Sequence, residues 1–428
     1  MKIEPATAVV GHIGVPGDKS ISHRAVLIAA VCEGETRIED FGRSMDTEST
    51  LAAVRALGVE VEEEDVDVLV VRGVGLRSLR APSEPIDCGS SGTLLALLMG
   101  LVAGQEGVFV LSGDESLRSQ PVEQVAGALR LMGAQVETTD GRPPVRIEGA
   151  QLRPVDHQLA SPNARMKSAL LLAGMQVREG RTAVTEPLFT RDHTESLLRA
   201  AGASISRSGR TVSVGPAESL RLSKVEVPGD ASCAAPFVTA ATLIAGSELS
   251  IHGVGVNPFR TALLDVLARM GSRIAVFDRR RLGGEAVADL EVRSAPLTAT
   301  TVRKAEVPRM VDELPLFALA AGLARGESSV RGSAQMREKA SDRIETVTNV
   351  LRSLGVRITA SEDGFRVRGV PTRPKGGGVL ESGGDDRITM LAAVGGLVSR
   401  EGVEIEDPGR VAVSFPGFFD LLESVTQR

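Results

Sequence analysis

The segment VPGDKS at residues 15–20 opens an alanine-rich apolar helix, and the nearly identical VPGDAS at residues 227–232 opens another. The two segments lie about half the chain length apart, so the sequence consists of two similar halves. The first copy carries Lys19 and Arg24, whereas the second has Ala231 and Pro236 at the matching places. A ligand site in such a protein often lies between its halves.

A finer repeat divides each half. Apolar helices recur, each followed by a glycine and a β-rich strand; they are predicted at residues 25–32, 94–103, 169–177, 234–245, 316–324 and 388–398. Glycine just past a helix adopts the left-handed capping conformation at little cost. In most repeats a second, amphipathic helix ends in a hydrophobic residue and a glycine, as in Leu57-Gly58, and an alternating strand such as residues 59–62 follows.

This pattern predicts an α/β fold of six repeats in two sets of three. The first helix of each repeat is apolar all round, so we expect it to be buried. If these helices run the same way within a half, their N-termini gather on one face, each with roughly half a positive charge and free N–H groups. Two such faces opposed across a cleft would attract a small, multiply charged anion. The alternative is that the repeats only build a core.

Composition narrows the class of protein. With 428 residues and 42% hydrophobic residues, the chain can form two cores. A net charge of −6 argues against nucleic acid or an anionic membrane as the main partner. Neither a signal peptide nor a membrane span is predicted, which favours the cytoplasm. The three cysteines (Cys32, Cys88 and Cys233) are expected to be buried free thiols, and no cysteine or histidine cluster indicates a metal.

Residues 16–24 form the most specific segment. Asp18 or Ser20 can cap the helix, and Lys19 and Arg24 project near its positive end. Two cations at that place need an anion to be stable. The alternative to a bound ligand is a structural ion pair with a nearby carboxylate, either Asp46 or Glu48.

With the rest of the chain, this segment resembles the 5-enolpyruvylshikimate-3-phosphate (EPSP) synthase family of enolpyruvyl transferases. The resemblance covers essentially the whole length. It depends on short motifs in a fixed order, at residues 16–24, 190–194, 312–315, 341–343, 384–388 and 414–419.

The resemblance implies two inside-out α/β domains, each of three repeated βαβαββ-type units, with the active site in the interdomain cleft. The first domain would span residues 19–229, and the second would span residues 1–18 and 230–428. The two repeated segments would then be hinge crossings, at residues 15–18 and 227–230. Family precedent also favours a monomer.

The implied reaction transfers the enolpyruvyl group of phosphoenolpyruvate to the 5-hydroxyl of shikimate 3-phosphate and releases phosphate, as a step of aromatic amino-acid biosynthesis. Both substrates are small anions, and no metal or organic cofactor is implied. The positions that match contacts to shikimate 3-phosphate are Lys19, Ser20, Arg24, Arg165, Arg191, Asp312 and Lys339. Those on the phosphoenolpyruvate side are Gly92, Gln120, Arg343 and Arg387. Asp312 and Lys19 match catalytic positions, with Asp312 the carboxylate that holds the reacting hydroxyl and shuttles its proton.

Several positions depart from the family pattern, and they fall where the family keeps its chemistry. An Asn and an Arg of one motif are replaced in GSSGTLLA at residues 89–96, and an Arg-Pro motif reads Gln120-Pro121. A Ser-Ala-Gln motif reads Asn-Ala-Arg at residues 163–165, and a Glu and a His implicated in proton transfer are also lost. The substituted positions are Ser90, Ala96, Gln120, Asn163, Arg165, Ala340 and Asp386.

These departures predict a folded protein whose family reaction is weak or absent. A charge-assisted hydrogen bond contributes roughly 1.5–3 kcal/mol, and a positioned acid or base contributes about 10²–10⁴ in rate. Arg165 adds a cation near the shikimate site, but it is not expected to replace the grip lost at Gln120. Three readings stay open: a working enzyme with an unusual site, a non-catalytic relative that binds shikimate 3-phosphate, and an enzyme that eliminates phosphate from a similar anion. A purely structural protein has no positive signal.

Overall fold

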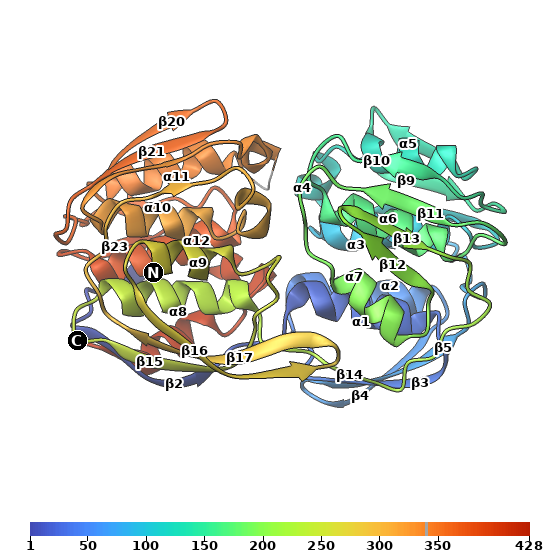
Figure 1. The fold of residues 1–428 in the computed structure, drawn as a ribbon, viewed down its shortest axis with the longest axis horizontal. Helices are drawn as coiled ribbons and strands as arrows, with labels where there is room; N and C mark the ends of the chain where they lie inside the picture. Colours follow the sequence, from blue (N-terminus) through green and yellow to red (C-terminus); the bar gives the residue numbers. More distant parts are fainter. Residues whose placement is uncertain (339–340) are drawn as a thin grey trace. The chain divides into compact units, whose positions relative to one another are not determined.

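A computed structural model describes residues 1–338 and 341–428, which fold into two compact units (Figure 1). Unit 1 comprises Met1–Pro16, Gly229–Arg280 and Ala286–Arg428, and unit 2 comprises Gly17–Pro228 and Arg281–Glu285. These limits lie close to the expected domain limits, and the hinge role of residues 15–18 and 227–230 stays a prediction. Within the described ranges, no helix combines the length and the apolarity needed to cross a membrane.

Unit 2 contains three four-stranded sheets with one shared topology. In each sheet the first two strands pair in parallel and the later pairs are antiparallel. In sheet order, the strands are β14 (Lys224–Glu226), β3 (Glu33–Glu39), β5 (Val68–Val74) and β4 (Glu60–Asp65); β6 (Ile86–Asp87), β7 (Val108–Ser112), β9 (Arg142–Glu148) and β8 (Gln135–Thr139); and β10 (Asp156–Gln158), β11 (Thr182–Thr185), β13 (Thr211–Val214) and β12 (Ile205–Ser208). With the intervening helices this is the expected βαβαββ order, except that the first repeat takes β14 from the far end of the unit.

Each repeat of unit 2 has one buried helix and one amphipathic helix. The buried helices are α1 (Lys19–Ala30), α3 (Gly92–Val102) and α6 (Ala164–Gly174). The amphipathic helices are α2 (Met45–Ala56), α5 (Glu123–Leu131) and α7 (His193–Ala200), and the short α4 (Glu115–Arg118) precedes α5. The predicted buried helices therefore form, although α1 and α6 begin earlier than their apolar stretches, because their first-turn polar side chains have partners inside the unit.

Unit 1 repeats the plan with more variation. Its sheets, in strand order, are β16 (Arg273–Leu282), β17 (Glu285–Arg293), β15 (Glu248–Gly255), β2 (Ala8–Gly14) and β24 (Thr426–Gln427); β18 (Thr301–Val302), β19 (Gly326–Val330), β21 (Gly364–Gly369) and β20 (Arg357–Ser361); and β1 (Lys2–Ile3), β23 (Val403–Ile405) and β22 (Val379–Leu380). The first repeat takes its parallel strand, β2, from the start of the sequence.

The helices of unit 1 alternate in the same way. The buried helices are α8 (Ala231–Leu243), α10 (Leu314–Leu323) and α12 (Asp386–Val398). The amphipathic ones are α9 (Ala262–Arg269), α11 (Arg343–Ser353) and α13 (Phe418–Val425). The 3₁₀ segments are η1 (Val307–Arg309), η2 (Ala334–Glu338) and η3 (Pro408–Val413).

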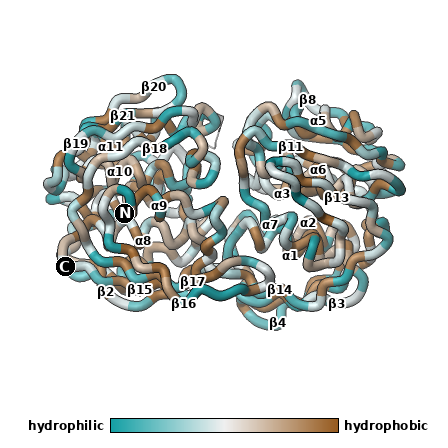
Figure 2. Tube along the Cα trace, viewed as in Figure 1, coloured by the Kyte–Doolittle hydropathy of each residue, from teal (hydrophilic) through white to brown (hydrophobic). Residues whose placement is uncertain are grey.

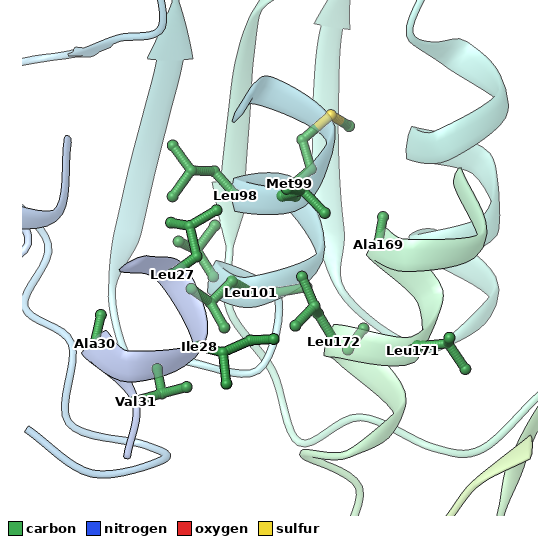
Figure 3. Packing of buried hydrophobic residues seen from close by; sticks show 14 of the residues in the cluster. Leu27, Ile28, Ala30, Val31, Leu98, Met99, Leu101, Ala169, Leu171 and Leu172 are labelled. Carbon is green, nitrogen blue, oxygen red and sulfur yellow. The ribbon is translucent and has the colours of Figure 1, made fainter. Parts of the chain in front are cut away.

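In each unit the sheets form the outer layers and the apolar helices lie inside, which is the inside-out arrangement (Figure 1). In unit 2, Leu27, Leu98 and Leu172 from α1, α3 and α6 meet in one buried cluster (Figure 3). The hydropathy pattern agrees, since α3 and α10 are brown and the exposed β4 is teal in Figure 2. The cysteines are buried free thiols, as predicted.

The glycines that follow the buried helices do not cap them as predicted, because the helices end several residues earlier, as α1 does at Val31 and α3 at Ala103. All these glycines have positive φ, from +71° at Gly402 to +122° at Gly107. Gly58, which ends α2 before β4, also has a positive φ of +87°. Because side chains other than glycine rarely adopt this conformation, Gly58, directly after the cap Leu57, fixes where α2 turns toward its strand.

Candidate functional site

Lys19 is the first residue of α1, and its ammonium group pairs with a carboxylate on α2. Its Nζ lies 2.7 Å from Oδ2 of Asp46, and Oδ1 of Asp46 accepts a hydrogen bond from Ser90 Oγ at 3.0 Å. The structural ion pair that was the alternative to a bound ligand is therefore present with Asp46, whereas Glu48 pairs with Arg43. The Lys19 side chain keeps 21% of its surface exposed. It can serve both the ion pair and a ligand.

Arg24 lies buried on α1 and joins the first repeat of unit 2 to the third. Its Nε donates to Thr194 Oγ1 at 2.7 Å, its Nη1 to the Ser20 carbonyl at 2.7 Å and its Nη2 to Ser168 Oγ at 3.1 Å. Arg191 Nη1 donates to Ser20 Oγ at 3.3 Å. Predicted residues from separate motifs thus meet in one cradle of cations and hydroxyl groups inside unit 2.

The pKa of Arg24 shows the electrostatic character of this cradle. Burial and then the neighbouring Arg191 guanidinium lower it to about 10, against weaker opposition from carboxylates that include Glu195 and Asp18. Two guanidinium groups held close together in a buried place repel each other. An anion between them would relieve that repulsion, which makes the cradle suited to a phosphate group.

Arg165 and Gln120 meet at the first residue of α3. Nη1 of Arg165 and Oε1 of Gln120 both lie within 2.8 Å of the point that a Cβ on Gly92 would occupy. Asn163 caps α6, since its side chain accepts a hydrogen bond from the Met166 amide at 3.1 Å. The arginine that the family pattern expects at position 96 is a buried alanine inside α3.

In unit 1, Arg343 lies in a group of carboxylates. Its Nη1 is 2.9 Å from Asp312 Oδ1, and its Nε and Nη2 lie 2.6 and 3.1 Å from the two oxygens of Asp385. Burial by itself would lower the pKa of Arg343, but Asp385 and then Asp312 outweigh it and raise the pKa. Arg343 therefore stays charged and holds Asp312 in place.

Arg387 lies beside the substituted position 386. Its Nη1 approaches the Ser232 carbonyl at 3.5 Å, its Nε lies 3.5 Å from Asp386 Oδ2, and Asp386 accepts a hydrogen bond from Ser414. Burial opposes the charge of Arg387, but Asp386 and then Asp312 raise its pKa. The carboxylate at position 386 thus already neutralises much of this cation.

The N-termini of the buried helices gather within each unit, as predicted. In unit 2 the contacts of Arg24 and Arg165 connect the first two turns of α1, α3 and α6. In unit 1, Ser232 on α8 contacts Glu313, the cap of α10, and Arg387 on α12. No acidic residue lies in the first turn of α1, α3, α6, α8 or α10, and α12 differs because it carries Asp386.

Two predicted positions, Lys339 and Ala340, lie outside the described residues. Within the residues that are described, no group of three or more His, Cys, Asp or Glu side chains is arranged to hold a metal ion. That the residue sets of the two units serve one common site stays a prediction from the sequence.

Sequence reasoning missed several residues that orient the predicted ones: Ser168 and Thr194 around Arg24, Asp385 on Arg343, and Ser414 on Asp386. Three of them lie in or beside the motifs at residues 190–194, 384–388 and 414–419. Ser168 was detectable as a hydroxyl group at the start of the apolar part of α6, since such a buried group needs a partner.

Comparison with known proteins agrees with this architecture. The family model described as EPSP synthase (3-phosphoshikimate 1-carboxyvinyltransferase) matches residues 3–422. The chain is 46% identical to the 3-phosphoshikimate 1-carboxyvinyltransferase of Gloeobacter violaceus, over 100% of this chain and 99% of that protein. It is 44% identical to the protein of that name from Alkalilimnicola ehrlichii, over 98% of this chain and 94% of the relative.

Solved structures show the same fold. EPSP synthase from Acinetobacter baumannii superimposes with a TM-score of 0.88 at 37% identity, over 99% of this chain and 97% of that one. The enolpyruvyl transferase NikO from Streptomyces tendae shares the fold with a TM-score of 0.79 at 21% identity. The fold is thus that of the enolpyruvyl transferases. Within this class, the chain belongs to the EPSP synthase family.

Proposed function

We propose that the protein binds shikimate 3-phosphate in unit 2 and transfers the enolpyruvyl group of phosphoenolpyruvate to its 5-hydroxyl, with a turnover well below that of the family. The observation that carries the proposal is the cradle around Arg24. Its arginines and hydroxyl groups come from different repeats, and the lowered pKa of Arg24 indicates a place that favours an added anion.

The reaction has simple requirements. The hydroxyl oxygen bonds to C2 of phosphoenolpyruvate, the bond from C2 to the phosphate oxygen breaks, and the hydroxyl proton ends on the released phosphate. Asp312, oriented by Arg343, is the candidate acceptor of that proton. Arg343 and Arg387 are candidate cations for the carboxylate of phosphoenolpyruvate.

The expected deficit lies in proton transfer. Position 386 holds a carboxylate between Ser414 and Arg387, where the family pattern has an imidazole, and position 340 holds alanine where the pattern has glutamate. Each positioned acid or base contributes about 10²–10⁴ in rate. Asp386 also favours the second candidate, a protein that binds shikimate 3-phosphate without turnover.

Calorimetry and a phosphate-release assay test this proposal. Wild-type protein should bind shikimate 3-phosphate and release phosphate slowly from both substrates together. The variant Ala340→Glu/Asp386→His should turn over at least 10²-fold faster than wild type. The control Ala340→Gln/Asp386→Asn restores side chains of similar size without the same acid–base groups, and it should stay slow.

Each outcome has a meaning. Absence of shikimate 3-phosphate binding would contradict the proposal itself. Ordinary family turnover by the wild type would contradict the reduced rate. Binding without turnover, unchanged in the Ala340→Glu/Asp386→His variant, would favour the non-catalytic candidate.

A further inference from the structure

Residues 120 and 165 carry a pair of side chains in the reverse of the family order. The family pattern places arginine at position 120 and glutamine at position 165, whereas this chain has Gln120 and Arg165. Considered separately, the first change removes a cation and the second adds one. Considered together, the pair keeps one guanidinium and one amide.

The structure brings the two side chains to one place. Gln120 follows α4 and Arg165 lies in the first turn of α6, yet their ends lie on the same side of Gly92, at the start of α3. Because both terminal atoms lie within 2.8 Å of one point, the guanidinium and the amide are neighbours. A cation on either residue would therefore act on nearly the same position.

That position favours an anion for reasons that do not depend on the family pattern. Ser91 Oγ accepts the Leu94 amide at 3.2 Å, so the amides of Gly92 and Thr93 need partners from outside α3. Arg165 adds its positive charge to the positive ends of both α3 and α6. Neither first turn carries an acidic residue, although acids are favoured there.

The same position is continuous with the lysine of α1. Ser90, two residues before Gly92, bonds the carboxylate that pairs with Lys19. Lys19 is therefore linked through Asp46 and Ser90 to the segment before Gly92, and it precedes Ser20 of the cradle around Arg24. Unit 2 thus offers a second cationic position, separate from the guanidinium pair of Arg24 and Arg191.

We propose that Arg165 supplies the cation for phosphoenolpyruvate that the family pattern places at position 120, so that the two residues have exchanged roles. This inference rests on the proposed function. Two expectations from the sequence are reversed. One was that Arg165 binds shikimate 3-phosphate, and the other was that it does not compensate for the arginine lost at position 120. The chain then keeps a cation for each of the two anions, and the deficit in rate lies mainly in proton transfer.

The test is a double-mutant cycle measured by calorimetry, with phosphoenolpyruvate titrated into protein saturated with shikimate 3-phosphate. Arg165→Gln should weaken the binding of phosphoenolpyruvate on the order of 10- to 100-fold and change the affinity for shikimate 3-phosphate by less than about threefold. Arg165→Gln/Gln120→Arg should restore most of the lost affinity, so the two changes are strongly non-additive. The control Arg118→Gln removes the same charge from an exposed arginine on α4 and should change neither affinity.

The single variant Gln120→Arg keeps Arg165, so it tests the inference even if Arg165→Gln does not fold. It should not bind phosphoenolpyruvate more tightly than wild type, because a second guanidinium would crowd the first. A tenfold gain would show that the cation had been missing, which would overturn the inference.

Other results separate this inference from the proposed function. An Arg165→Gln variant that loses affinity for shikimate 3-phosphate instead, or a double variant that recovers no affinity for phosphoenolpyruvate, overturns the inference alone. Wild-type protein that binds shikimate 3-phosphate but not phosphoenolpyruvate overturns both the inference and the proposed transfer. Wild-type protein that fails to bind shikimate 3-phosphate overturns the proposed function.

Discussion

The two units hold their arginines in opposite electrostatic surroundings. In unit 2, Arg24 lies near Arg191 and bonds to neutral groups, and its pKa is lowered to about 10. In unit 1, Arg343 and Arg387 lie among carboxylates that raise their pKa. Related repeats have thus produced one set of cations that favours an added anion and another that the protein itself has largely neutralised.

The first turn of α12 contributes to this difference. The first turns of α1, α3 and α6 have no acidic residue, as those of α8 and α10 have none, although Asp18 caps α1. On α12, Asp386 occupies the equivalent place and pairs with Arg387. We therefore expect the cations of unit 2 to determine the affinity for anions. The cations of unit 1, paired with carboxylates, should contribute more to the stability of the fold.

The largest expected effect comes from removing one cation in each unit. Arg343→Met leaves the buried carboxylate of Asp385 without its partner and should lower the free energy of unfolding by about 3–5 kcal/mol. Arg24→Met loses hydrogen bonds but removes a charge that Arg191 repels, so it should cost only about 1–2 kcal/mol. Denaturant unfolding followed by circular dichroism measures both, with hydrogen exchange of α1 and α11 to localise each effect. An equal or larger loss for Arg24→Met would break the comparison.

A smaller effect concerns His23, whose ring bridges Thr50 and Ser91 in unit 2. Burial lowers its pKa to about 3; Asp46 opposes this shift, and Lys19 and Arg24 add to it. At the matching place in the second half, unit 1 has Ala235.

The lowered pKa of His23 determines how the free energy of unfolding changes with pH. Between about pH 6.5 and pH 3 the unfolded chain binds a proton at His23 that the folded protein does not, so stability is lost as the pH falls. At pH 5 this loss is on the order of 2 kcal/mol relative to pH 7.5. Urea unfolding at both pH values should show that loss in the wild type and less of it in His23→Gln. His12→Gln, an exposed histidine on β2, should behave as the wild type, and an unchanged pH dependence in His23→Gln would contradict the argument.

Most of the fold could be predicted because its signals are local. Glycines such as Gly58 mark where helices end, and apolar stretches mark the buried helices. The strands β14 and β2 had no comparable signal, since the strands with which they pair in parallel lie far away in the sequence. The start of α1 was predicted from its capping residue, and Asp18 does cap it. The early start of α6 was missed, because its polar first turn, capped by Asn163, precedes the apolar stretch that marks the helix.

The sequence could predict which residues belong to the site, but not which of them contact each other. The motifs identified Lys19, Arg24 and Arg343, and the structure shows what each contacts. The meeting of Gln120 and Arg165 depends on how three helices lie side by side, which no short motif encodes. For that reason an apparent loss at position 120 could not be recognised from the sequence as half of an exchange.

The smallest expected effect tests whether Asp386 weakens anion binding. Asp386→Asn removes a carboxylate whose side chain is only 13% exposed and leaves Arg387 free of that partner. Two like charges about 7 Å apart repel by roughly 1–2 kcal/mol at an effective dielectric constant of 20–40. Phosphoenolpyruvate should therefore bind about tenfold more tightly to the variant saturated with shikimate 3-phosphate, as measured by calorimetry. Glu345→Gln removes the same charge from the first turn of the amphipathic α11 and should leave the affinity unchanged. If both variants bind as the wild type does, Asp386 does not limit the cation beside it, and the contrast between the units would have no consequence for binding.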